Sequence, residues 1–367
     1  MSDLEDLSSS ESEFSDCFLT SSNDEDDRRE RKPKNEKYIE QTVASYGEED
    51  FVEHFRVKRE IAIYLSQQLQ NSQYYFHQAG EHGKLTSYEY VLVFLWYAGH
   101  EAIGFRDVAD RFDISLSTLH KIIYRMTYFI SNMSYQIIKW PSEEEKPIIE
   151  ENFRRKGFPG VLGIIDGTHI RIDKPSEDPD SYYNRKSFFS FQAQVVCDHR
   201  RFIRDVFVGF PGSVHDSRVL RASPLFETLE EKCQNNYILG DSGYPCLKNL
   251  LTPFRDRGDL TRRQQNFNRK LSGTRYVIEH CFGILKQKYR QLYHLKMRKI
   301  EDMVHFFRAC CVLHNLNTDD LDDIVEINEN EEENQQRNAL AADADEGRDD
   351  GAGIRRRNEV MNILRMD

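Results

Sequence analysis

Three acidic residues of this chain stand in apolar surroundings, where an unpaired charge is costly. Asp166 follows the apolar run VLGII, and Asp241 follows the run YILG. Glu279 lies within TRYVIEHCFGILKQKYRQL, whose spacing predicts a helix with a broad apolar face. A turn at Gly167 or an ion pair with Arg171 would explain Asp166 alone. Two aspartates that each end a predicted buried strand instead favour one shared site.

Carboxylates that converge on one point repel one another, and a bound divalent cation with oxygen ligands is the usual resolution. Mg²⁺ or Mn²⁺ suits such a site best. Two such ions about 4 Å apart would activate a water or a 3′-hydroxyl and stabilise the leaving oxygen of an in-line phosphodiester displacement. Asp166, Asp241 and Glu279 are therefore predicted to be both the catalytic residues and the metal ligands.

Other residues could also supply such chemistry. Asp216, in GSVHDS, is a rival for the second acid because it too follows a β-rich run, FIRDVFVGF. His215 and Asp216 together keep open a metal phosphohydrolase of the HD type, although those proteins are helical and this pair follows a predicted strand. His169 is more typical of a packed or hydrogen-bonded histidine than of a ligand. The sequence has no GxxxxGK[ST], HExxH or GxSxG motif, so ATP hydrolysis, zinc proteolysis and serine hydrolysis have no support.

The elements that must position these residues change along the chain. From Phe51 to Trp140 apolar residues recur every three or four positions, which predicts helices, and Thr86 or Ser87 can cap one of them. From Val161 to Tyr244 short β-rich runs alternate with turn residues. Two further helices are expected, over about 274–292 and 300–316. The pattern predicts an α/β domain that follows a helical one.

The net charge of −12 is unevenly distributed over the 367 residues. Residues 1–31 carry 11 acidic and 3 basic residues, and residues 319–367 carry 16 and 6, which leaves +6 on the segment between them. Acidic tails poor in aromatic residues are predicted to be disordered, whereas a basic central part suits a polyanionic partner. The cluster RRERKPK at 28–34 is either a nuclear-import signal or a solvated charge run.

The segment GFRDVADRFDISLSTLHKIIYRM, at 104–126, fits a helix-turn-helix. Asp113 would lie at the turn and Ser115 would cap the second helix. The positions predicted to be buried between the helices are Val108, Ala109, Phe112, Ile114, Leu119 and Ile122. The second helix is expected to expose Ser117, Thr118, His120, Lys121 and Arg125 toward DNA. The alternative is a helical hairpin that only packs against its neighbours.

Two further stretches are predicted to contact DNA phosphates. FRDRGDLTRRQQNFNRKLSGTR, at 254–275, has seven basic residues against two acidic ones and is expected to be a loop beside the acidic site. Its candidate DNA-binding residues are Arg262, Arg263, Arg269, Lys270 and Arg275. Arg185 and Lys186 form the second candidate strip. The alternative for both stretches is an ordinary exposed loop.

The seven cysteines are odd in number and form no CxxC pair, which predicts reduced core thiols. No run of about 18 apolar residues is present, and the N-terminus is acidic and Ser-rich. We therefore expect a soluble intracellular protein without a membrane span or a signal peptide.

Six blocks of the sequence together resemble a known family. They are IIDGTHIRI, SYYNRKSFFSFQAQVVCD, FPGSVHDSRVL, ILGDSGYPCLKNLLTPF, VIEHCFGILKQKYRQL and ACCVLHNL, in this order between about residues 160 and 316. The order of strand Asp, strand Asp and helix Glu resembles the DDE arrangement of ribonuclease H-like transposases. More narrowly, the blocks resemble the PIF/Harbinger transposase superfamily, including the Harbinger transposase-derived nucleases of animals. The metal-binding acids of that family fall on Asp166, Asp241 and Glu279, which favours Asp241 over Asp216.

The resemblance implies a ribonuclease H-like α/β fold with a mixed sheet and flanking helices, which would follow the N-terminal all-helical helix-turn-helix domain that the apolar spacing predicts. It further implies cleavage of double-stranded DNA with strand transfer, and a Myb-like partner protein that helps in DNA binding and in entry into the nucleus. The nucleus is the expected location, with the cytoplasm as a second one, and no membrane is expected as a partner. The expected domains are a disordered acidic tail (1–48), a helical domain (49–145), a nuclease domain (146–318) and a second disordered tail (319–367). The competing hypothesis is a domesticated protein that binds DNA or chromatin without cutting. The sequence does not fix the oligomeric state, and a homo-oligomer is one state that it allows.

Overall fold

The computed structural model describes residues 35, 37–75, 85–101, 104–318 and 349–366. The first part is helical: η1 (Tyr38–Thr42), η2 (Val43–Ser45), α2 (Glu48–Phe55), α3 (Arg59–Gln70), α4 (Ser87–Gly99), α5 (Phe105–Arg111), α6 (Leu116–Asn132), α7 (Ser134–Ile137) and α8 (Glu145–Arg155). The strands are β1 (Val161–Arg171), β2 (Ser190–Cys197), β3 (Ile203–Pro211), β4 (Tyr237–Leu239) and β5 (Leu250–Leu251). The other helices are α9 (Pro179–Tyr182), α10 (Asp216–Ala222), α11 (Pro224–Cys233), α12 (Arg262–Lys288), η3 (Arg290–Tyr293), α13 (Ile300–Leu316) and α15 (Gly351–Ile363).

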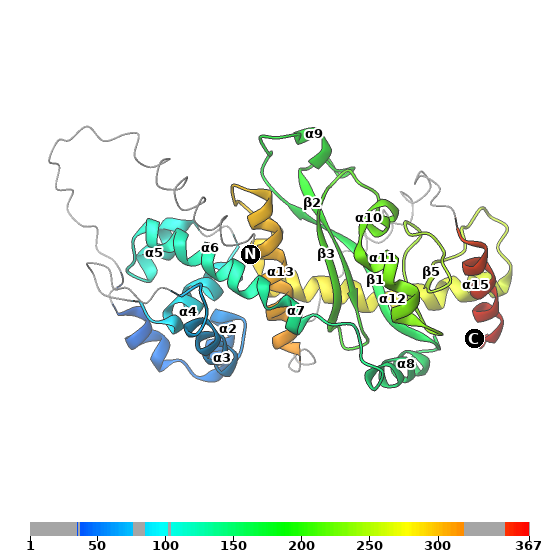
Figure 1. Cartoon of the computed structure of the whole chain (residues 1–367), viewed down its shortest axis with the longest axis horizontal. Coiled ribbons are helices and arrows are strands. Elements are labelled where there is room, and N and C mark those ends of the chain that lie inside the picture. Colours follow the sequence, from blue (N-terminus) through cyan, green and yellow to red (C-terminus); the bar gives the residue numbers. More distant parts are fainter. Residues whose placement is uncertain (1–34, 36, 76–84, 102–103, 319–348, 367) are drawn as a thin grey trace. The chain divides into compact units, whose positions relative to one another are not determined.

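The five strands form one mixed sheet in the order β3-β2-β1-β4-β5 (Figure 1). The pairs β1–β2 and β2–β3 are antiparallel, whereas β1–β4 and β4–β5 are parallel. Every residue of β2 and β4 is buried. This mixed α/β architecture is consistent with a ribonuclease H-like fold and confirms the predicted fold class at that level.

Helices cover the sheet and join it to the helical part of the chain. The helix α12 packs on β1 and β2, and α8 packs on β1. A core cluster that includes Ile165, Leu220, Leu229 and Ile238 joins β1 and β4 to α10 and α11. The helix α13 contacts both β3 and α6, so it connects the sheet with the helices that precede it (Figure 1).

The helices α5 and α6 and the turn between them follow the pattern expected from the sequence. The six positions predicted to be buried are all buried, from Val108 to Ile122. Asp113 takes a left-handed conformation at the turn, with a φ of 49°. The hydroxyl of Ser115 accepts from the backbone N–H of Thr118 and caps α6. DNA binding by this pair of helices stays a prediction.

Several predicted boundaries are wrong. The segment 1–48, expected to be a disordered tail, includes the described helices η1 and η2, in which Tyr38 and Val43 are buried. The tail expected over 319–367 contains the helix α15, while residues 319–348 lie outside the described residues, as does the basic cluster at 28–34. Of the basic stretch 254–275, which was expected to be a loop, residues 262–275 instead form the first half of α12, and Thr261 completes a capping box with Gln264.

Two sequence-based expectations concern the protein as a whole. Six cysteines are free and buried, as predicted, and Cys17 lies outside the described residues. Within the described ranges, no helix combines the length and the apolar character needed to cross a bilayer.

Candidate carboxylate site at the end of the sheet

Asp166 lies within β1 and not at its end as predicted. The pairing of β1 with β2 runs from Ile164 to Arg171, so this edge of the strand continues past Asp166. On the other edge, the parallel pairing with β4 stops at Ile164, opposite Leu239. Ile164 and Asp166 lie on the same face of β1, and Asp166 is the first residue of that face beyond the end of the pairing with β4. Its buried side chain can therefore contact groups outside the sheet.

The sheet register explains why Asp241 comes close to Asp166. Ile164 pairs with Leu239, and each aspartate follows its paired residue by two positions. Residues two apart in extended chains lie on the same side. Asp241 is half-buried and its Oδ1 accepts from the backbone N–H of Gly243 at 2.9 Å, which fixes the turn after β4.

Asp166 forms a buried ion pair with Arg275 of α12. The Nη2 atom of Arg275 lies 3.1 Å from Asp166 Oδ2, and the two side chains are 15% and 7% exposed. The other oxygen of Asp166, Oδ1, accepts from the N–H of Gly167 at 2.9 Å. Although the ion pair is close, neither Asp166 Oδ2 nor Arg275 Nε makes a hydrogen bond to any described residue. The pair is thus held by charge more than by hydrogen-bond geometry.

The guanidinium of Arg275 lies among all three predicted acids. Burial lowers the pKa of Arg275, but the negative charges of Asp166, Asp241 and Glu279 outweigh that effect and raise it. Glu279 is four residues from Arg275 on α12, so both side chains lie on the same face of this helix. The structure therefore brings the three acids into one electrostatic neighbourhood around a single cation.

Among the described residues, no three His, Cys, Asp or Glu side chains are arranged to hold a metal ion as they stand. The residues nevertheless have the chemistry that a divalent cation needs. Asp166 Oδ2 is a buried carboxylate oxygen without a hydrogen bond from the described chain. Asp241 and Glu279 lie close enough for their charges to act on the same guanidinium as that of Asp166. A hard cation with oxygen ligands fits such a group of carboxylates.

The other histidines and acids near the site have partners. His169 Nδ1 lies 3.1 Å from the Ser190 hydroxyl, in agreement with its interpretation as a hydrogen-bonded residue. His215 Nε2 lies 2.7 Å from a guanidinium nitrogen of Arg185. Asp216, at the start of α10, accepts from the amide nitrogen of Gln192 on β2. Gln192 was not predicted, although a glutamine in a strand buried along its whole length was a signal that the sequence offered.

The predicted DNA-binding residues of the central domain fall into two surfaces and one buried position. Arg262, Arg263 and Arg269 are exposed on the first turns of α12. Arg185 and Lys186 are exposed in the turn before β2. Lys270 is half-buried on α12, whereas Arg275 lies at the carboxylates and away from these exposed positions.

The predicted DNA-binding face of α6 is only partly exposed. Arg125 is buried, with 9% exposure, and its charge lies beside the Tyr90 hydroxyl. The prediction that Arg125 faces solvent is therefore wrong. The ring of His120 stacks on Phe105 with centroids 4.3 Å apart. Ser117, His120 and Lys121 are exposed, whereas Thr118 is half-buried. The hydroxyls of Ser117 and Thr118 lie 2.9 and 2.8 Å from that of Ser115.

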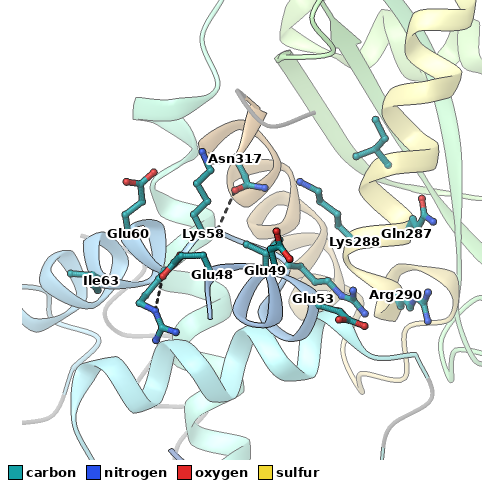
Figure 2. A pocket seen from close by; sticks show the side chains of 14 residues that line it. Glu48, Glu49, Glu53, Lys58, Glu60, Ile63, Gln287, Lys288, Arg290 and Asn317 are labelled. Atoms are coloured by element: carbon teal, nitrogen blue, oxygen red, sulfur yellow. Dashed lines mark hydrogen bonds and ion pairs between the residues drawn. The ribbon is translucent and has the colours of Figure 1, made fainter. Parts of the chain in front are cut away.

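A large cavity lies apart from the carboxylates (Figure 2). It has a volume of about 1010 Å³ and is lined mainly by α2, the start of α3 and the end of α12. Figure 2 shows Lys58 beside Asn317, whose side-chain oxygen accepts from the backbone N–H of Lys58 at 3.4 Å. Its lining mixes four glutamates with five basic residues, so it has no dominant charge. None of the predicted site residues lines it.

Comparison with known proteins identifies the class of the central domain. Residues 165–315 match the family described as DDE superfamily endonuclease. The chain therefore carries a DDE superfamily endonuclease domain and is homologous to the Harbinger-derived nucleases, which confirms the resemblance inferred from the six blocks.

Individual relatives bear related names. The human protein named putative nuclease HARBI1 is 31% identical over 215 residues, which are 57% of this chain and 61% of that protein. The Arabidopsis thaliana protein ALP1-like is 27% identical over 227 residues, 57% of this chain and 55% of that protein. The Arabidopsis thaliana protein named antagonist of like heterochromatin protein 1 is 26% identical over 229 residues, 57% of each chain. The chain spans less than two thirds of the length of these relatives. No solved structure matches it.

Proposed function

We propose that this chain is a divalent-metal-dependent DNA endonuclease of transposase origin. The observation that carries the proposal is the group of Asp166, Asp241 and Glu279 around Arg275, in which Asp166 is buried and the other two acids are half-buried. Carboxylates that gather at one place repel one another, and a bound divalent cation with oxygen ligands is the usual way in which such a group is stabilised. The DDE endonuclease family and the nuclease name of the human relative support the same assignment.

The three acids would hold Mg²⁺ or Mn²⁺, with Asp166 and Asp241 as the nearer pair and Glu279 completing the site. When bound, such ions make water or a 3′-hydroxyl a stronger nucleophile and stabilise the leaving oxygen of the cleaved phosphodiester, and the same chemistry permits strand transfer. Arg275 keeps the carboxylates together without a metal and offers a positive charge to a phosphate that enters the site. The sheet and α12 provide the rigid support that such chemistry requires.

The exposed basic residues of α12 would hold the DNA backbone near this site. Arg262, Arg263 and Arg269 lie on the same helix as Arg275 and Glu279, and Lys270 adds to them. Arg185 and Lys186 would contact a second stretch of backbone. Such contacts fix the position of the duplex without reading its sequence. The helices α5 and α6 would add a helix-turn-helix contact through Lys121, Ser117 and His120.

Double-stranded DNA as substrate implies that the protein acts in the nucleus, where a Myb-like partner would help it to bind DNA. A second candidate function is DNA or chromatin binding without cleavage. It is favoured by the Arg275–Asp166 ion pair, which neutralises the central acid without any metal. The name of the heterochromatin-related relative agrees with that candidate.

The two candidates are separated by incubating supercoiled plasmid with the full chain and Mg²⁺ or Mn²⁺. The nuclease proposal expects nicking that Asp166→Asn and the triple variant Asp166→Asn, Asp241→Asn, Glu279→Gln abolish, while a gel-shift assay still detects DNA binding. Equal nicking by the chain and the triple variant would reject the assignment of the acids. The matched control is Asp173→Asn, since Asp173 is an exposed carboxylate whose contact is His294.

A further inference from the structure

The helix α15 lies outside the segment that matches the endonuclease family, yet it contacts α12 and β5 (Figure 1). The residues before this helix bind both backbone polar groups of Cys246. Its N–H donates to Asp349 Oδ1 at 3.0 Å, and its carbonyl oxygen accepts from the N–H of Asp350 at 2.9 Å. A methyl group built on Gly353 would clash with the carbonyl of Cys246. Because only a glycine lets the two backbones approach so closely, α15 has a fixed position on the sheet domain.

One face of α15 borders a cavity that is rich in basic side chains. The cavity has a volume of about 300 Å³ and lies between α15 and the turns that precede β4 and β5. The charged residues that line it are Lys248, Arg355, Arg356 and Glu359. Arg356 donates to the carbonyl oxygen of Asn235 at 2.8 Å. The guanidinium of Arg355, in contrast, is exposed and has no hydrogen bond or ion pair with any described residue. This cavity therefore offers an anion a cation without a partner.

The same face of α15 continues to the basic start of α12. Arg355 and Asn362 are about two helical turns apart, so they lie on one face of the helix. The side-chain oxygen of Asn362 accepts from Arg263 of α12 at 2.9 Å. The carbonyl oxygen of Arg365 accepts from the side-chain amide of Asn266, also on α12, at 3.0 Å. These two contacts place α15 directly beside the arginines of α12 that are proposed to bind DNA.

The surface that α12 and α15 form together is basic, although the whole chain is acidic. Residues 252–270 carry six basic and two acidic residues, and residues 349–366 carry four and three. The exposed guanidinium of Arg365, like that of Arg355, has no partner among the described residues. The 13 residues of α15 span about 20 Å, which is about the length of six base pairs of a duplex. Several phosphates of one DNA backbone can therefore reach this surface.

We propose that α15 extends the DNA-binding surface of α12, with Arg355 and Arg365 as additional contacts to the phosphate backbone. This inference rests on the proposed function, because it states where the DNA substrate lies beyond the carboxylate site. A phosphate oxygen accepts hydrogen bonds, and a guanidinium can donate two parallel ones to a phosphate. The alternative is a helix that only stabilises the domain and whose exposed arginines are solvated. The two explanations differ in whether DNA affinity depends on α15.

The inference is tested by fluorescence anisotropy of the full chain with a labelled short duplex over a KCl series, in a chelating buffer that prevents cleavage. The double variant Arg355→Gln, Arg365→Gln should show a shallower salt dependence, by about one unit of slope for each phosphate that it no longer binds. Its affinity near 0.1 M KCl should fall by roughly tenfold for each such contact. The control Lys296→Gln, Arg298→Gln removes two exposed charges between η3 and α13 and should keep both the slope and the affinity.

Gly353→Val tests the same inference without any change of charge. Its larger side chain has no room against Cys246, so it should displace α15 from α12. DNA affinity should then fall although every arginine is retained. Thermal unfolding followed by circular dichroism shows whether each variant is folded. Where Gly353→Val is unfolded, the double variant at the exposed positions 355 and 365 decides the question alone.

The outcomes separate this inference from the proposed function. If the full chain binds and nicks DNA while Arg355→Gln, Arg365→Gln keeps the affinity and the slope, α15 is not a DNA-binding surface and the nuclease proposal stands. An equal loss of affinity in the control Lys296→Gln, Arg298→Gln would also overturn the inference, because net charge alone would then explain the effect. If the full chain neither binds nor nicks DNA, both proposals fail.

Discussion

The guanidinium of Arg275 lies 3.1 Å from the carboxylate of Asp166, and both side chains are largely buried. This ion pair occupies the place where the sequence predicted a metal ion among three acids. An arginine and a divalent cation meet the same need, since either reduces repulsion among buried carboxylates. The relation between Arg275 and metal binding is therefore open to direct measurement.

Removal of Arg275 should destabilise the protein in a way that metal relieves. Arg275→Ala leaves Asp166 buried without its partner, and loss of one member of a buried pair costs about 3–5 kcal/mol. We expect the melting temperature of Arg275→Ala to fall in a chelating buffer and to recover in part when Mn²⁺ is added. Arg262→Ala, on the exposed start of the same helix, is the control. If Mn²⁺ does not raise the lowered melting temperature of Arg275→Ala, the carboxylates do not bind the ion.

The sequence singled out the three acids because the signals for them are local. Asp166 and Asp241 each follow an apolar run that had to be buried, and Glu279 interrupts an apolar helix face. What it could not predict is how these residues pair. The contact between Arg275 and Asp166 depends on the rotation of α12 against β1, and the approach of Asp216 depends on where α10 begins. Both are properties of packing between elements far apart in the chain.

The errors at Arg125 and in the last tail have the same origin. The spacing of the apolar residues in α6 predicted that Arg125 lies near the edge of the apolar face. Its packing beside Tyr90 buries it instead. In the last segment, the average composition is acidic, which concealed a local pattern. The buried residues Gly353, Arg357, Val360 and Leu364 recur at helical spacing. Arg357 packs on Phe254, which lies about a hundred positions earlier in the chain, so the docked structure reveals a helix that the composition of the segment conceals.

The helix α15 should contribute to stability although it lies in a segment predicted to be disordered. Arg357 packs over the ring of Phe254 at 4.3 Å and donates to the carbonyl oxygens of Thr252 and Pro253 at 3.4 and 3.2 Å. Arg357→Ala removes these contacts and should lower the free energy of unfolding by about 1–3 kcal/mol in urea titrations. Arg355→Ala, at an exposed position of the same helix, should change it by less than about 0.5 kcal/mol. Equal effects of the two would mean that α15 is not docked in solution.

The exposed arginines of α12 should set the salt dependence of DNA binding. Each phosphate that a basic residue binds contributes a slope of about −0.9 to the logarithm of affinity against the logarithm of salt concentration. The triple variant Arg262→Gln, Arg263→Gln, Arg269→Gln should therefore show a slope that is shallower by about one for each phosphate it no longer binds. Fluorescence anisotropy with a short duplex over a KCl series measures it. The control is the double variant Lys296→Gln, Arg298→Gln, which changes two exposed basic residues between η3 and α13. It should keep the salt dependence of the unchanged chain. An equally shallow slope in this control would indicate that net charge, not the α12 surface, binds DNA.

Asp302 should make stability depend on pH through its burial at the start of α13. Burial raises the pKa of Asp302, against the opposing hydrogen bond that Tyr128 donates to it at 2.9 Å. Because the pKa in the folded state lies above that in the unfolded state, the protonated form is favoured by folding. The stability gained in this way is present below the unfolded value of about 3.9 and is lost as the pH rises through the folded value.

Asp302→Asn keeps an oxygen acceptor for Tyr128 and carries no charge, so it should be more stable than the unchanged chain around neutral pH. The difference in free energy of unfolding should shrink as the pH falls toward about 4. Urea unfolding followed by circular dichroism over a pH series measures this difference. Glu301→Gln removes an exposed charge from the same helical turn and controls for the interaction with the helix dipole. A lower stability of Asp302→Asn at neutral pH would mean that the charged carboxylate is well paired in the folded protein, and that its burial does not oppose ionisation.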